Sequence, residues 1–321
     1  MPACDASLLK LPAVLVSITN FPVSARPQAG LSFAPIIFEI YISEGMTRLL
    51  AVFYGECIHV SVSNPNGVQV NQVGPIRSGR KPYKYIHDSF QGSCLVYASA
   101  TKALLGFLPD CKMVYGKDSD DINSAFLDVT EMYKIAQANN PNRPFNYTGN
   151  LFSDTVPSSG QSADTLNVFY NYLNQALWKY DPLSGMYLRS ENFPKIPEQF
   201  SPATDRLTGQ QLAISNIIVL FARHTVDTPT IIDIDLAAGT GGYAYLFRDG
   251  KVFKIRWTTM NGQYEKDTGL RRPIRFTDEA GNPIALKPGN TWIHVMTADS
   301  SVSEQSSGEW QARFYAPAGA K

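Results

Sequence analysis

The chain has 321 residues, 28 Lys+Arg balanced by 28 Asp+Glu, and a 44% hydrophobic content that fits a folded protein rather than a disordered one. The balanced charge provides no bulk positive field, so we expect no nucleic-acid partner. No apolar run approaches the roughly 18 to 20 residues that a membrane-crossing helix needs, so we expect no transmembrane span.

The first segment, MPACDASLLKLPAVLV, lacks the basic region, apolar core and small-residue cleavage site of a secretory signal. Two alternatives follow. Either the protein is cytosolic, or an export segment has been removed from this sequence. The cysteines favour the second alternative.

The first half mixes strands with helices. Runs dense in β-branched and aromatic residues that end at turn formers predict strands at residues 13–18, 35–42, 49–55, 58–63 and 94–99. Helical spacing follows at residues 101–108, and the apolar positions of Asn123–Asn140 predict an amphipathic helix capped by Asn123. A mixed α/β domain is therefore expected over residues 1–145.

The four cysteines are Cys4, Cys57, Cys94 and Cys111, and none of them makes a CxxC pair or has a histidine at metal-ligand spacing. We expect no metal site and no cofactor. The segment KALLGFLPD, between Cys94 and Cys111, predicts one helix followed by a turn that reverses the chain direction. This favours a disulfide between the two cysteines. Buried free thiols remain the alternative.

A stretch rich in Pro, Asn, Gly and Ser, residues 139–164, predicts a connector, with the domain boundary within residues 140–165. Beyond it, short alternating runs and the turn signals Asp-Pro-Leu-Ser-Gly and Arg-Asp-Gly predict a mostly antiparallel β domain over residues 146–321. The overall fold class is therefore α+β. The many aromatic residues of this half either fill its core or line a groove for a carbohydrate or a peptide.

Charged residues interrupt the apolar strands of the first half. Glu39 lies inside one predicted strand and Arg48 opens the next, so a turn at Glu44 would bring Glu39 and Arg48 together across a hairpin. The stretch GPIRSGRKP then adds Arg77, Ser78 and Arg80.

Motifs in both halves resemble one family. RPQAGLSFAPIIFE, EGMTRLLAVFYG and VGPIRSGR follow one another as in the N-terminal domain of the YerB-like bacterial lipoprotein family. DRLTGQQLAISNIIVLF, GYAYLFRDGKVFKIRWT and FTDEAGNPIALKPGNTWIHV resemble its β-rich C-terminal domain. The resemblance implies a two-domain protein of the cell envelope, exported and often held by a lipid anchor. It implies no chemistry.

Two interpretations of GPIRSGRKP stay open. In the first, Arg26, Arg48, Arg77, Ser78 and Arg80 converge to hold a carboxylate or phosphate through bidentate hydrogen bonds. In the second, Arg77 pairs with Glu39 or Glu44, and Arg80 stays in solvent.

The favoured function is an extracytoplasmic binding or scaffold protein whose partner is an envelope polyanion, a glycan or another protein. One alternative is a hydrolase or transferase acting on an envelope glycan or phosphodiester, with Glu39, Glu44 or Ser78 as catalytic candidates beside an arginine clamp. A subunit of a surface layer or filament is the second alternative.

Overall fold

A computed structural model describes residues 9–55, 71–109, 111–139, 144–193 and 196–321. Cys4, Cys57 and the strand predicted at residues 58–63 lie outside the described residues. In the part of the chain that is described, no helix is both long and apolar enough to span a bilayer.

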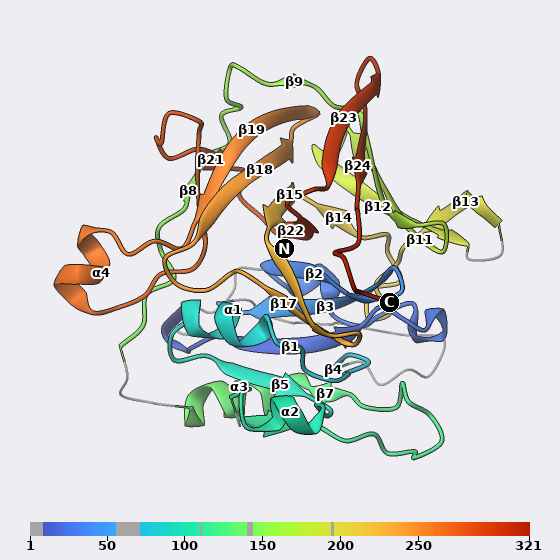
Figure 1. Ribbon diagram of the computed structural model, residues 1–321, viewed down its shortest axis with the longest axis vertical. Helices are drawn as coiled ribbons and strands as arrows, with labels where there is room; N and C mark the ends of the chain where they lie inside the picture. Colours follow the sequence, from blue (N-terminus) through green and yellow to red (C-terminus); the bar gives the residue numbers. More distant parts are fainter. Residues whose placement is uncertain (1–8, 56–70, 110, 140–143, 194–195) are drawn as a thin grey trace.

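The fold is predominantly β, with few and short helices (Figure 1). The larger sheet has eleven strands. In spatial order its main path is β20 (Arg275–Thr277), β19 (Lys251–Thr258), β18 (Gly241–Arg248), β15 (Asn216–Ala222), β22 (Thr291–Thr297), β2 (Ile36–Ser43), β3 (Met46–Phe53), β1 (Val14–Thr19), β5 (Cys94–Tyr97) and β6 (Lys112–Met113), and β9 (Gln161–Ser162) pairs with β19.

A second sheet packs beside it and is built wholly from the second half. Its strands are β13 (Ile196–Pro202), β12 (Met186–Phe193), β11 (Asn174–Asp181), β10 (Thr165–Asn171), β24 (Glu309–Arg313) and β23 (Ser301–Ser306), with β14 (Ala213–Ile214) paired to β12. Three small ribbons complete the described strands: β16 (His224–Thr228) with β17 (Ile231–Ile234), β8 (Leu151–Phe152) with β21 (Ala285–Leu286), and β4 (Gln72–Val73) with β7 (Leu127–Asp128).

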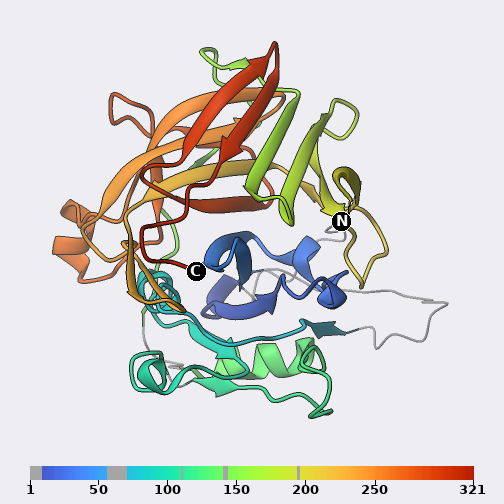
Figure 2. The same cartoon turned by 45° about the vertical axis from the view of Figure 1, so that its right-hand side comes forward.

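The two halves of the chain share the larger sheet. β2 of the first half runs parallel to β22 of the second, with Ile36 opposite Thr291 and Ile40 opposite Val295. Figure 2 shows the blue strands of the first half lying directly beneath the orange and red strands of the second. Backbone hydrogen bonding is therefore continuous across the sequence midpoint.

The predicted hairpins of the second half are confirmed. Arg248 pairs with Lys251 across the Asp249-Gly250 turn, where both turn residues have positive φ, as a tight hairpin of matching twist requires. Asp181 and Met186 likewise close β11 onto β12.

The helices of the first half are α1 (Tyr83–Ser89), α2 (Lys102–Leu105) and α3 (Val129–Ala138), and the second half adds α4 (Gln263–Thr268). Single 3-10 turns form at Val23–Ala25 and Leu31–Phe33. The predicted start of α3 is wrong. Asp128 rather than Asn123 caps it, since the Asp128 carboxylate accepts a hydrogen bond from the backbone N–H of Thr130 while the preceding residues pair with β4.

The expected disulfide joins Cys94, the first residue of β5, to Cys111 just before β6. Many of the aromatic side chains of the second half lie in the core, and others are exposed. Trp178, Tyr187 and Trp292 are completely buried, whereas Tyr172 and Tyr243 are more than half exposed.

Candidate functional site: an arginine cluster

The segment 74–80 lies across the ends of two parallel strands. The N–H of Arg77 donates to Ser17 O of β1 at 2.9 Å, and the carbonyl of Arg77 accepts from Ala98 N, just after β5, at 3.0 Å. β1 and β5 are parallel neighbours, so their carboxyl ends meet at one edge of the sheet. Ligands commonly bind at that edge in open sheets with parallel strands.

Three arginines meet at this edge, and we call Arg48, Arg77 and Arg80 the arginine cluster. Arg48 comes from β3, where it pairs with Thr19 of β1, and it is only 3% exposed. Its Nη1 donates to the carbonyl of Ser78 at 3.3 Å. The Nε atoms of all three arginines are buried and have no hydrogen-bond partner among the described residues.

Within the described chain, the positive charge of the cluster is not balanced. Among the described residues, no carboxylate forms an ion pair with Arg48, Arg77 or Arg80. Burial, together with the neighbouring Arg80 and Arg77, lowers the pKa of Arg48 to about 9. Burial raises the pKa of the adjacent Tyr83, so this phenol stays neutral and supplies no counter-charge.

Hydroxyl groups lie at the outer side of the cluster. The hydroxyls of Ser78 and Ser99 are 2.8 Å apart in a solvent-accessible position, and the hydroxyl of Ser17 donates to the carbonyl of Ser78. Guanidinium and hydroxyl donors beside each other match the acceptors of an oxyanion such as phosphate or carboxylate.

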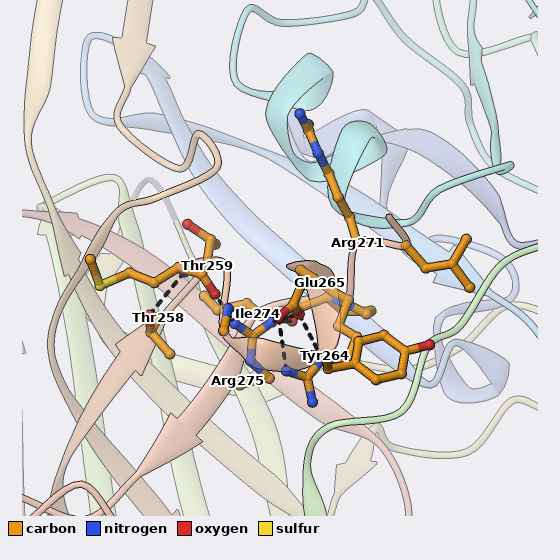
Figure 3. Close-up of polar contacts among 12 residues, drawn as sticks. Thr258, Thr259, Tyr264, Glu265, Arg271, Ile274 and Arg275 are labelled. Carbon is orange, nitrogen blue, oxygen red and sulfur yellow. Dashed lines mark hydrogen bonds and ion pairs between the residues drawn. The ribbon is translucent and has the colours of Figure 1, made fainter. Parts of the chain in front are cut away.

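In a second group of arginines, a carboxylate balances the guanidinium charge (Figure 3). Arg272 donates to both oxygens of Glu265, at 2.6 and 3.0 Å, and Arg275 lies 3.3 Å from the same carboxylate. Hydrogen bonding from Arg272 lowers the pKa of Glu265 to about 2. Figure 3 shows Arg271 extending away from this pair. In contrast to the arginine cluster, these partly buried guanidinium groups have a carboxylate partner.

The expectation that Glu39 and Arg48 meet across the hairpin is wrong. Glu39 pairs with Leu49, and Arg48 pairs with Ile40, so the two side chains occupy neighbouring register positions. Successive residues of a strand point to opposite faces, and the two charges therefore lie on opposite sides of the sheet. The expected pairing of Arg77 with Glu39 or Glu44 is likewise not formed within the described chain.

Glu39 instead lies in a buried charge network between the two sheets. It accepts hydrogen bonds from Thr47 at 2.8 Å and from the indole N–H of Trp292 at 3.0 Å, and Arg189 Nη1 lies 3.3 Å away. Burial alone would raise the pKa of Glu39, but Arg189, His294 and these hydrogen bonds outweigh it and lower the pKa. The carboxylate is therefore ionised and already well supplied with donors.

Arg26 joins the same network, away from the cluster. It forms a 3.0 Å ion pair with Glu191, which also accepts from Arg189 Nε at 3.2 Å. The guanidinium of Arg189 lies over the rings of Trp178 and Trp292, at 5.1 and 4.3 Å from their centroids. Of the candidate ligand-binding residues, the structure brings together Arg48, Arg77, Ser78 and Arg80, and it separates Arg26 from them.

Sequence reasoning missed Arg189 and His294. The indole N–H of Trp178 donates to His294 Nε2 at 3.0 Å, while His294 Nδ1 lies 3.4 Å from Glu39. Burial is the main cause that lowers the pKa of His294 to about 3. Glu44, by contrast, is exposed in the β2–β3 turn with a φ of 52°.

Comparisons with known proteins cover nearly the whole chain. Domain models described as "Protein of unknown function (DUF3048)" match at residues 1–161 for the N-terminal domain and 166–293 for the C-terminal domain. The chain is 26% identical over 320 residues to "Putative lipoprotein YerB" of Bacillus subtilis (strain 168), a match over 92% of this chain and 84% of that protein. The crystal structure of the YerB protein from Bacillus subtilis aligns with a TM-score of 0.64 and 24% identity, over 92% of this chain and 93% of that one.

Proposed function

Since this chain belongs to the DUF3048 family and resembles YerB along most of its length, we propose that it is a cell-envelope protein that binds an anionic envelope component at the arginine cluster. The family resemblance inferred from the motifs is thereby confirmed.

Two observations support a place outside the cytoplasm. The Bacillus relative is named as a lipoprotein, a class of protein anchored at the cell surface. The Cys94–Cys111 disulfide fits an oxidising compartment, because thiols of cytosolic proteins are normally kept reduced.

The unbalanced charge of the arginine cluster carries the binding proposal. Three guanidinium groups with buried, unpartnered Nε atoms are held together at the ends of β1 and β5. Such an arrangement costs folding free energy through charge repulsion and through unsatisfied donors. An oxyanion placed among Arg77, Arg80 and the Ser78 hydroxyl would relieve the charge repulsion. A phosphate or carboxylate group of an envelope polymer has this chemistry.

The alternative of catalysis by Glu39 or Glu44 receives no support from the geometry. Glu39 faces the other side of the sheet in a saturated network, and Glu44 lies at a hairpin turn. The hydroxyl of Ser78, the third catalytic candidate, lies 2.8 Å from the Ser99 hydroxyl, and no histidine or carboxylate among the described residues bonds to it. The proposal therefore concerns binding.

Titration calorimetry with inorganic phosphate and with long-chain polyphosphate, at constant ionic strength, tests the proposal. We expect the unmodified protein to bind and Arg77→Gln or Arg80→Gln to weaken binding at least tenfold, about 1.4 kcal/mol. Arg271→Gln is the matched control, because it removes the same charge from an exposed arginine. Absence of binding, or equal affinity in the cluster variants and the control, would reject the site.

A further inference from the structure

A cavity of about 470 Å³ opens between the two halves of the chain, on a different part of the molecule from the residues of the arginine cluster. Its walls come from the start of β2, from β22 and from the segments 145–152 and 273–276. The lining is mainly hydrocarbon and aromatic, and it includes Ile36, Phe90, Phe145, Tyr147, Phe276 and Ile293. Cavities of this size are typical of small-molecule sites.

The aromatic part of the wall is held in place by ring contacts. The Tyr147 ring stacks on Phe145 with centroids 4.7 Å apart and contacts Phe90 at 5.3 Å and Tyr54 at 5.4 Å. These contacts fix the shape of the wall, so a ligand would not have to order it.

Several polar side chains of the lining are already hydrogen-bonded within the protein. The Tyr147 hydroxyl accepts from Ala13 N at 3.0 Å and donates to the carbonyl of Gln91 at 3.2 Å. The Asn150 amide donates to the carbonyl of Ile274 and accepts from Phe276 N.

The amide of Asn146 is engaged in the same way, since it donates to the Tyr264 hydroxyl and accepts from Thr148 N. Among the described residues that line the cavity, none is charged. An occupant would therefore gain mainly apolar contacts, and an ionic group would find no counter-charge in the interior.

Large apolar side chains also stand exposed at the cavity. Phe152 is 50% exposed and Leu9 is 61% exposed, and both contribute to the lining. An apolar occupant that extends outward would cover both and remove their surface from water.

We infer that this cavity binds the hydrocarbon chain of an amphiphile, with the polar head group left outside in solvent. A flexible hydrocarbon chain suits a cavity whose lining is mainly apolar and carries no charged residue to hold an ionic ligand. The inference does not depend on the arginine cluster, so either proposal can fail without the other.

Displacement of the uncharged fluorophore N-phenyl-1-naphthylamine by octanoate, decanoate and laurate measures this binding. We expect affinity to rise about fourfold for each added methylene until the cavity is full, since each buried methylene contributes a constant free energy. Dilauroyl phosphatidylglycerol vesicles form a second arm. If the protein binds free laurate but not the vesicles, the source of the hydrocarbon chain is a soluble fatty acid. If it binds both, the source is a membrane lipid.

Two variants test the location. Thr148→Trp adds bulk at an exposed lining position, and Ile36→Phe fills the interior from a partly exposed one. Both should weaken laurate binding at least tenfold, while Thr208→Trp, the same change at an exposed position that does not line the cavity, should leave it unchanged. Melting curves establish that each variant is folded. Failure of the fluorophore and laurate to bind, or unchanged binding in both cavity variants, would overturn the inference.

Discussion

Arg189 of β12 and Glu39 of β2 form a 3.3 Å ion pair that links the two sheets, and both side chains are almost completely removed from solvent. Because both side chains are buried, bulk water cannot readily replace either partner. Their contact makes the packing of one sheet on the other depend on a specific electrostatic match.

Neutralising Glu39 should therefore strongly lower the free energy of unfolding. Glu39→Gln preserves the volume but leaves the charge of Arg189 without its inter-sheet partner, and we expect a loss of about 3 to 5 kcal/mol in the free energy of unfolding. Urea denaturation measures it. Glu44→Gln, at the exposed turn, should stay within about 0.5 kcal/mol of the unmodified protein. Similar small effects for both variants would show that the pair is not important for stability.

Acid should destabilise the protein through His294. Its pKa in the folded protein is about 3, below the ordinary 6.5, so between these values the unfolded chain binds more protons than the folded one. Stability must then fall as pH falls through this window, by about 1.4 kcal/mol per pH unit for each such group. Burial lowers the pKa of His224 to about 4 and adds a loss of the same sign.

Unfolding free energies measured at pH 7, 6 and 5 check this dependence. We expect the slope of stability against pH to be smaller in His294→Gln, and smaller again in the variant that also carries His224→Gln. The lowered pKa of Glu39 adds stability that is present above its ordinary value of 4.5 and is lost only at lower pH, outside this range. An unchanged slope in the double variant would contradict the assignment.

Loss of the disulfide should weaken the first half of the chain. The bridge closes a loop of sequence separation 17 between β5 and the residue before β6. Replacing Cys94 and Cys111 together by Ala should lower the free energy of unfolding by about 3 kcal/mol, since the unfolded chain regains its loop entropy. The check is urea denaturation with and without reductant. Reductant should lower the free energy of unfolding of the unmodified protein toward that of the variant. The free energy of unfolding of the variant itself should not change.

The arginine cluster should behave oppositely to a structural ion pair. Without ligand, Arg77→Gln should raise the free energy of unfolding by on the order of 1 kcal/mol, because it removes repulsion within the cluster. Arg272→Gln, which breaks the paired arrangement with Glu265, should lower it by up to about 1 kcal/mol. Thermal melting in chloride buffer distinguishes the two signs. A marked loss of unfolding free energy in Arg77→Gln would show that Arg77 stabilises the fold instead of destabilising it.

Local sequence patterns predicted several of the strands and hairpins. The strands around Ile37, Leu50 and Val96 followed from dense β-branched and apolar residues, and the Asp249-Gly250 hairpin from its turn chemistry. The end of a helix depends on competing hydrogen bonds, so Asp128 displaced Asn123 as the cap of α3 once the preceding residues had paired with β4.

The site was only partly predictable. Arg77, Ser78 and Arg80 are close in sequence, and Arg48 joins them because β3 pairs with β1 beside the segment that carries them. The face toward which Glu39 points depends on hairpin register, which a shift of one residue reverses. The partners of Glu39, Arg189 and His294, come from distant strands, and no local pattern marks either of them.

The pairing of β2 with β22 also constrains the order in which the protein can be made. During synthesis β2 emerges early and can pair at once with β3, yet its other hydrogen-bonding edge stays open until β22 follows late in the chain. Such distant pairing slows folding and leaves an unpaired strand edge open to other chains. The newly made first half thus carries an exposed template for aggregation that only the second half can cover.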